Sequence, residues 1–146
     1  MSDAKMTDDE EHLTQLPKVD VLRVDISPNP THISDELNLE VDFAVSQTVR
    51  EGYWEVQYLV DSVLRRHIIK LGRTEATDYA RGENHFQFTT PHIDVSDIKP
   101  SNLANCGLLS ATFKSKDGDA IMDLKMVVQV SKQGESMQRI IYNPLE

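Results

Sequence analysis

The sequence predicts an all-β domain, an immunoglobulin-like antiparallel β-sandwich of about eight strands, and three observations support this prediction. Apolar and polar residues alternate with a period of two along several segments, as in strands that are buried on one face. Turn residues separate these segments at short intervals, and Asp117-Gly118 is a strong hairpin signal. No long segment has the periodicity of an amphipathic helix. Many strands joined by tight turns favour two sheets packed face to face.

The clearest predicted strand covers residues 37–45, where apolar residues alternate with Asn38, Glu40, Asp42 and Ala44. The same alternation predicts strands at residues 54–60 and 122–130. Weaker patterns predict strands at 19–26 (with a bulge near Val21 and Leu22), 66–71, 85–90, 108–114 and 137–142. Turn signals lie at 28–30, 50–52, 116–119 and 132–135, and residues 96–105 are expected to form a short helical turn or an irregular crossover.

Length and charge pattern predict one domain with a tail. The chain has 146 residues, which is close to the usual size of a single domain. Residues 1–16 include the acidic run Asp8 to Glu11 and have no apolar periodicity, so we expect a disordered acidic tail. The remaining residues, 17–146, are expected to form a single β-sandwich domain.

Composition restricts the partners and the compartment. A net charge of -9 argues against direct binding to nucleic acid and favours a basic or neutral partner, which we expect to be another protein. The single cysteine, Cys106, excludes an intrachain disulfide and is typical of a reducing compartment. No apolar run is long enough for a membrane span, and the acidic N-terminus does not resemble a signal peptide. We therefore expect an intracellular protein, nuclear or cytoplasmic or both, that is monomeric and binds no membrane.

No catalytic or metal-binding pattern stands out. His32, His67, His85 and His92 do not share a metal-ligand spacing, and Cys106 has no base near it in the sequence. The nucleophile elbow, the P-loop and the dinucleotide-binding fingerprint are all absent from the sequence. The sequence thus predicts a protein that is not an enzyme and that needs no cofactor or metal.

The aromatic residues at inward positions of the predicted strands are expected to form the core. Separately, a basic cluster lies at the start of the predicted strand 66–71. The aromatic residues at inward positions are Phe43, Trp54, Tyr58, Phe86 and Phe88. The basic cluster is Arg65-Arg66-His67. Arg65 and Arg66 are either contacts for an acidic partner or charges on a solvated strand edge that discourage edge-to-edge pairing.

From about residue 19 to 130, the order of motifs resembles the globular core of the anti-silencing function family of histone chaperones. A first strand leads into Pro28-Asn29-Pro30, and a strand that begins with Trp54 ends in Val60-Asp61-Ser62. The remaining motifs, in order, are Ile68 to Gly72, Phe86-Gln87-Phe88, Leu108 to Phe113, Asp117-Gly118 and Met126 to Val130.

The resemblance implies a partner and a set of contact residues. One sheet of the family docks a helix of a core histone, and the closing strand accepts a histone tail by strand addition. By this resemblance, Leu108 or Leu109 is the central apolar contact, and Val128 and Val130 belong to the closing strand. The charges depart from the family pattern, because Leu64-Arg65-Arg66 replaces an acidic stretch and Asp119 replaces a basic residue.

The sequence is compatible with three functions. The first is a histone-chaperone-like module that docks a core histone pair through one sheet face and an edge strand. The second is an intracellular adaptor or assembly factor with a non-histone protein partner. The third is a carrier whose two sheets part to admit a prenyl or acyl chain, which would need an apolar cavity between the sheets.

Overall fold

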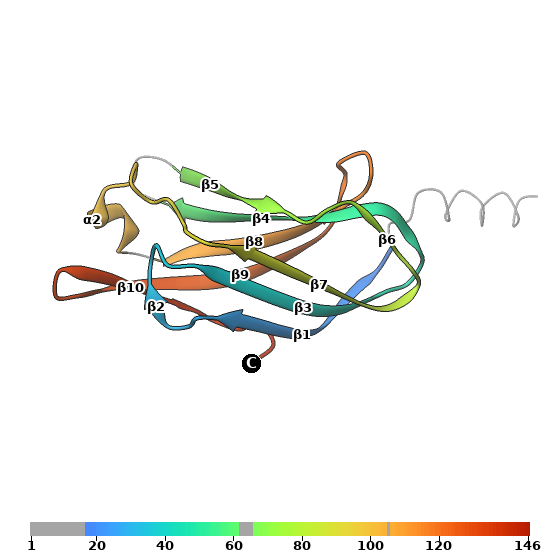
Figure 1. Cartoon of the computed structure of the whole chain (residues 1–146), viewed down its shortest axis with the longest axis horizontal. Helices are drawn as coiled ribbons and strands as arrows, with labels where there is room; N and C mark the ends of the chain where they lie inside the picture. The colour runs from blue at the N-terminus through green and yellow to red at the C-terminus, as the bar shows by residue number, and fades with distance from the viewer. Residues whose placement is uncertain (1–16, 62–65, 105) are drawn as a thin grey trace, which may run out of the picture.

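A computed structural model describes residues 17–61, 66–104 and 106–146, so the predicted tail over residues 1–16 lies outside the described residues. The chain forms two antiparallel sheets packed as a sandwich, which confirms the predicted fold class. Figure 1 shows α2 and the β9–β10 hairpin at the same end of the elongated molecule. The predicted crossover contains this single short helix, α2 (Pro100–Leu103), which begins at a proline.

The strand order places β8 and β9 inside the larger sheet. The three-stranded sheet has the order β1 (Val19–Ser27), β3 (Leu37–Val45), β7 (Gly82–Thr90). The seven-stranded sheet has the order β2 (Thr31–His32), β10 (Ser136–Ile141), β9 (Ala120–Gln133), β8 (Cys106–Lys114), β4 (Val49–Asp61), β5 (Arg66–Arg73). The short strand β6 (Thr77–Tyr79) pairs with the beginning of β4.

The strands with the strongest alternation match their predicted positions. Strand β3 covers the predicted residues 37–45, and each of its inward side chains is buried. The expected irregularity in β1 is also present, because the register with β3 shifts between Val21 and Arg23. All eight predicted strands form, with ends that differ by a few residues.

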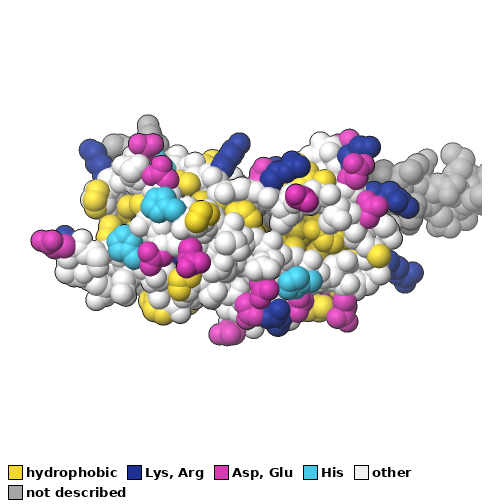
Figure 2. All heavy atoms as spheres, viewed as in Figure 1, with side chains coloured by type: hydrophobic (Ala, Val, Ile, Leu, Met, Phe, Trp, Pro, Cys, Tyr) yellow, Lys and Arg dark blue, Asp and Glu magenta, His cyan; other side chains and the backbone are white. Residues whose placement is uncertain are grey.

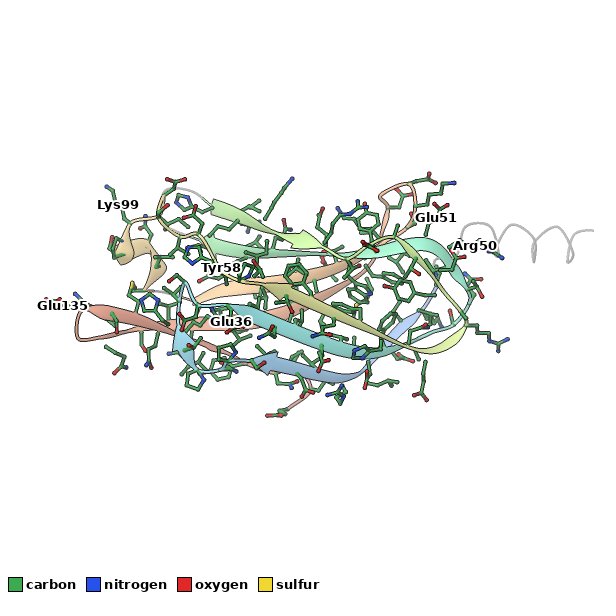
Figure 3. All side chains as sticks on the ribbon, viewed as in Figure 1. Glu36, Arg50, Glu51, Tyr58, Lys99 and Glu135 are labelled. Carbon is green, nitrogen blue, oxygen red and sulfur yellow. The ribbon has the colours of Figure 1, made fainter. Side chains whose placement is uncertain are left out.

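The predicted turn at residues 50–52 is wrong, and β2 and β6 were not predicted. Arg50, Glu51 and Gly52 lie inside β4, where the register with β6 shifts between Val49 and Gly52 (Figure 3). Glu51 has a positive φ of 51°, and its N–H donates to Asp78 Oδ1 over 2.9 Å. The turn residues therefore mark a bulge, whose extra residue β6 and the Asp78 side chain hold in place.

An aromatic cluster fills the space between the sheets. Phe43 contacts Trp54 edge to face at 5.1 Å, and Trp54 stacks between Phe86 at 4.4 Å and Phe113 at 4.8 Å. Tyr79 completes the cluster. All five residues predicted for the core are buried. Because these rings fill the sandwich, they leave no room beside them for a prenyl or acyl chain, and the carrier function loses support.

A small hollow of about 10 Å³ lies near one end of the core, beside Tyr58 and Arg139. Tyr58 is 3% exposed, and its hydroxyl has no hydrogen-bond partner among the described residues (Figure 3). Burial raises the pKa of Tyr58 to about 12. The folded protein therefore favours the neutral phenol more strongly than the unfolded chain does.

We expect the stability of the protein to fall between pH 10 and pH 12 because of Tyr58. The unfolded tyrosine ionises near its ordinary pKa of 10.0, whereas the folded one ionises at about 12. Its contribution is present in full below pH 10 and is lost, by roughly 2–3 kcal/mol, as the pH rises to 12. Urea unfolding of the wild type and Tyr58→Phe at several pH values measures this difference.

Tyr58→Phe should remove this alkaline step and should change stability at pH 8 by less than about 1 kcal/mol, because the hydroxyl it deletes has no described partner. An equally steep alkaline loss in Tyr58→Phe would contradict the assignment.

Candidate protein-binding face

A row of apolar side chains crosses the outer face of the seven-stranded sheet. Leu59 on β4 pairs with Ile68 on β5 and with Leu108 on β8, and Leu108 pairs in turn with Val127 on β9. Tyr142, just after β10, extends the row, because its N–H donates to the Val127 carbonyl over 2.9 Å. Ile68 is 54% exposed, Val127 44% and Tyr142 48%. Contiguous exposed apolar side chains of this kind mark interaction surfaces.

The alternation of β8 determines which of its two leucines belongs to this row. Leu108 points outward and is half-buried between its neighbours, whereas Leu109 points inward and is 1% exposed. Gly107 precedes them, and a Cβ at this position would lie 2.6 Å from the Leu59 carbonyl oxygen. Glycine thus permits the close approach of β8 to β4 beneath the apolar row.

Polar side chains border the row and line a shallow hollow of about 390 Å³. Asp123 on β9 accepts hydrogen bonds from Ser110 Oγ, over 3.2 Å, and from Thr112 Oγ1. Lys114 Nζ lies 2.9 Å from Glu55 Oε1, and this hydrogen bond raises the pKa of Lys114. The hollow is lined by Gln57, Leu59, Arg66, Cys106, Gly107, Leu108, Ser110, Asp123, Lys125 and Val127.

The predicted contact residues divide between the surface and the core. Leu108 lies in the apolar row, and Arg66 lines the same hollow. The alternative of Leu109 as the central contact is wrong, because this side chain packs inside the sandwich. Val128 and Val130 are 2% and 5% exposed, so their side chains also belong to the core. Arg65 lies outside the described residues.

The expectation that Val128 and Val130 mark an open strand edge is also wrong. Strand β10 pairs with β9 from Ile141↔Val128 to Ser136↔Gln133, so the chain's own strand occupies this edge. The sequence predicts a strand at 137–142 after this closing strand, but nothing in the sequence indicates that it covers the edge. A tail that added a strand beside Val128 and Val130 would first have to displace β10.

Buried polar contacts hold β10 in place. Arg139 on β10 is 1% exposed, and its guanidinium donates to the carbonyl oxygens of His32, Ile33, Asp35 and Glu36 over 3.4, 3.0, 2.9 and 2.5 Å. Asn29 bonds to both backbone groups of Ile141, over 2.7 and 2.9 Å. Burial lowers the pKa of Arg139. Sequence reasoning missed Arg139, although its position between Met137 and Ile141 on an alternating strand was a signal.

The outer face of the three-stranded sheet carries a network of charged side chains, in which Asp25, Glu40 and Asp42 lie close to Arg23 and His85. Asp42 lies 2.8 Å from Arg23 Nε and 2.6 Å from His85 Nδ1. These contacts lower the pKa of Asp42, with the hydrogen bond from Arg23 as the largest cause. Figure 2 shows charges of both signs, with a histidine among them, gathered along the lower margin over β1 and β3. The apolar row has no counterpart among the described residues of this face.

The described part of the chain contains no cluster of three or more His, Cys, Asp or Glu side chains that could hold a metal ion. Within the same residues, no helix is long and apolar enough to cross a membrane. Cys106 is exposed at the start of β8, in the lining of the hollow.

The sandwich and its apolar row define a class: an immunoglobulin-like β-sandwich with an open face suited to contact with another protein. Residues 16–139 match the model of a family described as ASF1-like histone chaperone, and the chain belongs to this family. The resemblance found in the order of the sequence motifs is thereby confirmed. No curated protein matches the chain. Histone chaperones are binding proteins rather than enzymes.

Proposed function

We propose that this protein docks a core histone pair on the outer face of the seven-stranded sheet, with Leu108 at the centre of the contact. Membership of the histone-chaperone family supports the partner, and the apolar row supports the surface. The single observation that carries the proposal is the row itself, because it places partly exposed apolar side chains on neighbouring strands, in register.

The dimensions of the row fit one helix of a partner. Neighbouring strands lie about 4.8 Å apart, so a row that runs from β5 to the residue after β10 extends over roughly 19 Å. A helix rises about 1.5 Å per residue, so about 13 residues lie along this length. Apolar side chains spaced three and four residues apart on such a helix would meet Leu59, Leu108 and Val127.

We expect Leu108→Glu to weaken the binding of a purified core histone pair by about 100-fold or more, because it places a charge at the centre of a desolvated contact. Isothermal titration calorimetry at moderate salt measures the affinity. The melting temperature should change little, because the Leu108 side chain points outward. The matched control is Leu22→Glu, the same substitution at a 48% exposed leucine on the other sheet, which should bind as the wild type does.

Two results would count against the proposal. The first is the absence of a salt-tolerant complex between the unmutated protein and the histone pair. The second is a complex that Leu108→Glu and Leu22→Glu leave equally intact, which would move the contact away from this face.

A second candidate is an adaptor or assembly factor that uses the same face for a non-histone protein. Arg66, which lines the hollow, favours it, because the family has an acidic stretch near this position. Affinity capture from cell extract followed by mass spectrometry discriminates between the two candidate functions, since it recovers either histones or another protein in amounts that depend on Leu108.

With either partner, we propose a monomer of the nucleus or cytoplasm that has no enzymatic activity and does not bind nucleic acid directly.

A further inference from the structure

A second row of side chains, next to the apolar row, carries lysines at both ends. Gln57 on β4 pairs with Lys70 on β5 and with Ser110 on β8, and Ser110 pairs with Lys125 on β9. The two lysines are exposed and lie on the same outer face as Leu59 and Leu108. Each residue of this second row lies two residues along its strand from a residue of the apolar row. The apolar row is therefore bordered on this side by cations.

Neither Lys70 nor Lys125 has an ion-pair partner among the described side chains. The described carboxylates nearest along the strands, Glu55 and Asp123, lie one row further away. Both have partners, because Glu55 pairs with Lys114 and Asp123 accepts from Ser110 and Thr112. Asp123 lines the same hollow as Lys125, and Asp94 and Asp97 line a hollow with Lys70. None of these carboxylates forms an ion pair with either lysine among the described residues, so both ammonium groups remain available to a partner.

We propose that the partner helix docked on this face carries Asp or Glu residues along one side of its apolar stripe, where they meet Lys70 and Lys125. This inference rests on the proposed docking face and adds the charge of its occupant. A charge opposite to that of the lysines favours the encounter and fixes the orientation of the helix, whereas a basic flank is repelled.

The spacing of the two lysines predicts the spacing of the acidic residues. Three strand spacings separate β5 from β9 across the sheet, which is roughly 14 Å. On a helix this corresponds to about nine or ten residues, and the nearest repeats that return to one side are 7 and 11 residues. Acidic residues two or three turns apart would therefore each lie within reach of one flexible lysine side chain.

Two synthetic helical peptides test the inference against the full chain. Both peptides carry an apolar stripe of leucines at positions i, i+4, i+7 and i+11, and both are stapled on the opposite face. They differ only along one side of this stripe, where one peptide has glutamates and the other has lysines. We expect the glutamate peptide to bind the wild type at least about tenfold more tightly at low salt, which corresponds to about 1.4 kcal/mol. The preference should shrink as salt is added.

A double variant, Lys70→Glu with Lys125→Glu, should reverse this preference. The matched control, Lys99→Glu with Lys132→Glu, changes the net charge equally at exposed lysines elsewhere and should keep it; Lys99 lies at the end of the molecule that holds α2 (Figure 3). Equal binding of both peptides, tighter binding of the lysine peptide, or no binding of the glutamate peptide would overturn the charge inference. The proposed function is judged separately, by whether the histone pair binds and depends on Leu108.

Discussion

Replacing Leu109 with glutamate is expected to prevent cooperative folding of the domain. The side chain is 1% exposed and lies within the core that the two sheets share. The substitution removes about 2–3 kcal/mol of apolar burial and places a carboxylate in the core without a partner. The combined loss exceeds about 5 kcal/mol and approaches the whole stability of an ordinary domain.

Leu108→Glu, one residue earlier, is the matched control for this prediction. The two variants have the same composition and the same net charge, and they differ only in which face of β8 receives the glutamate. Circular dichroism during urea titration should show a transition near that of the wild type for Leu108→Glu and none for Leu109→Glu. A stable, cooperatively unfolding Leu109→Glu variant would contradict the inward orientation of this side chain.

Arg139→Met is expected to lower the free energy of unfolding by about 3–4 kcal/mol. Methionine fills much of the same volume but donates no hydrogen bond, so four carbonyl oxygens between His32 and Glu36 lose their donor. Hydrogen bonds from a charged donor contribute about 1.5–3 kcal/mol each, and the water that reaches the partly buried carbonyls offsets part of their sum. Urea unfolding measures the loss.

The same variant should loosen β10 before the rest of the sheet. Amide hydrogen exchange should speed up at β10 residues and at their partners on β9, while the amides of β3 and β4 remain protected. Arg50→Met removes an arginine whose side chain is 79% exposed and should change stability by less than about 0.5 kcal/mol. A loss below about 1 kcal/mol in Arg139→Met would mean that the buried guanidinium does not anchor this strand.

The sequence predicted the strands of the core because apolar and polar residues alternate along them with a period of two, which determines the face of each strand that is buried. Along β3 every second residue is apolar and the residues between are polar or small, so only one face can be buried. The same argument placed Phe43, Trp54 and Tyr58 in the core, where they are found. It also gave the eight main strands and, through the order of their motifs, the family.

The sequence could not assign Leu108 and Leu109, because both are apolar and alternation does not separate two adjacent leucines. Their faces follow from the register of β8 with its neighbours, in which Leu109 lies opposite Tyr58 and Met126, both buried. The apolar row depends on the same register. It joins Ile68, Leu59, Leu108 and Val127 from four strands, and no local pattern indicates that they are neighbours.

Only the tertiary structure shows that β10 covers the edge of β9 and where the charged side chains lie. Arg139 is buried because carbonyl groups more than a hundred residues earlier in the chain surround it. The net charge of -9 favours a basic or neutral partner, yet strand pairing places Lys70 and Lys125 beside the apolar row. The sequence by itself determined the strands, the core aromatics and the family. The docking face and its charge required the tertiary structure, because they arise from pairing between strands distant in the chain, whereas sequence periodicity reports only the two faces of one strand.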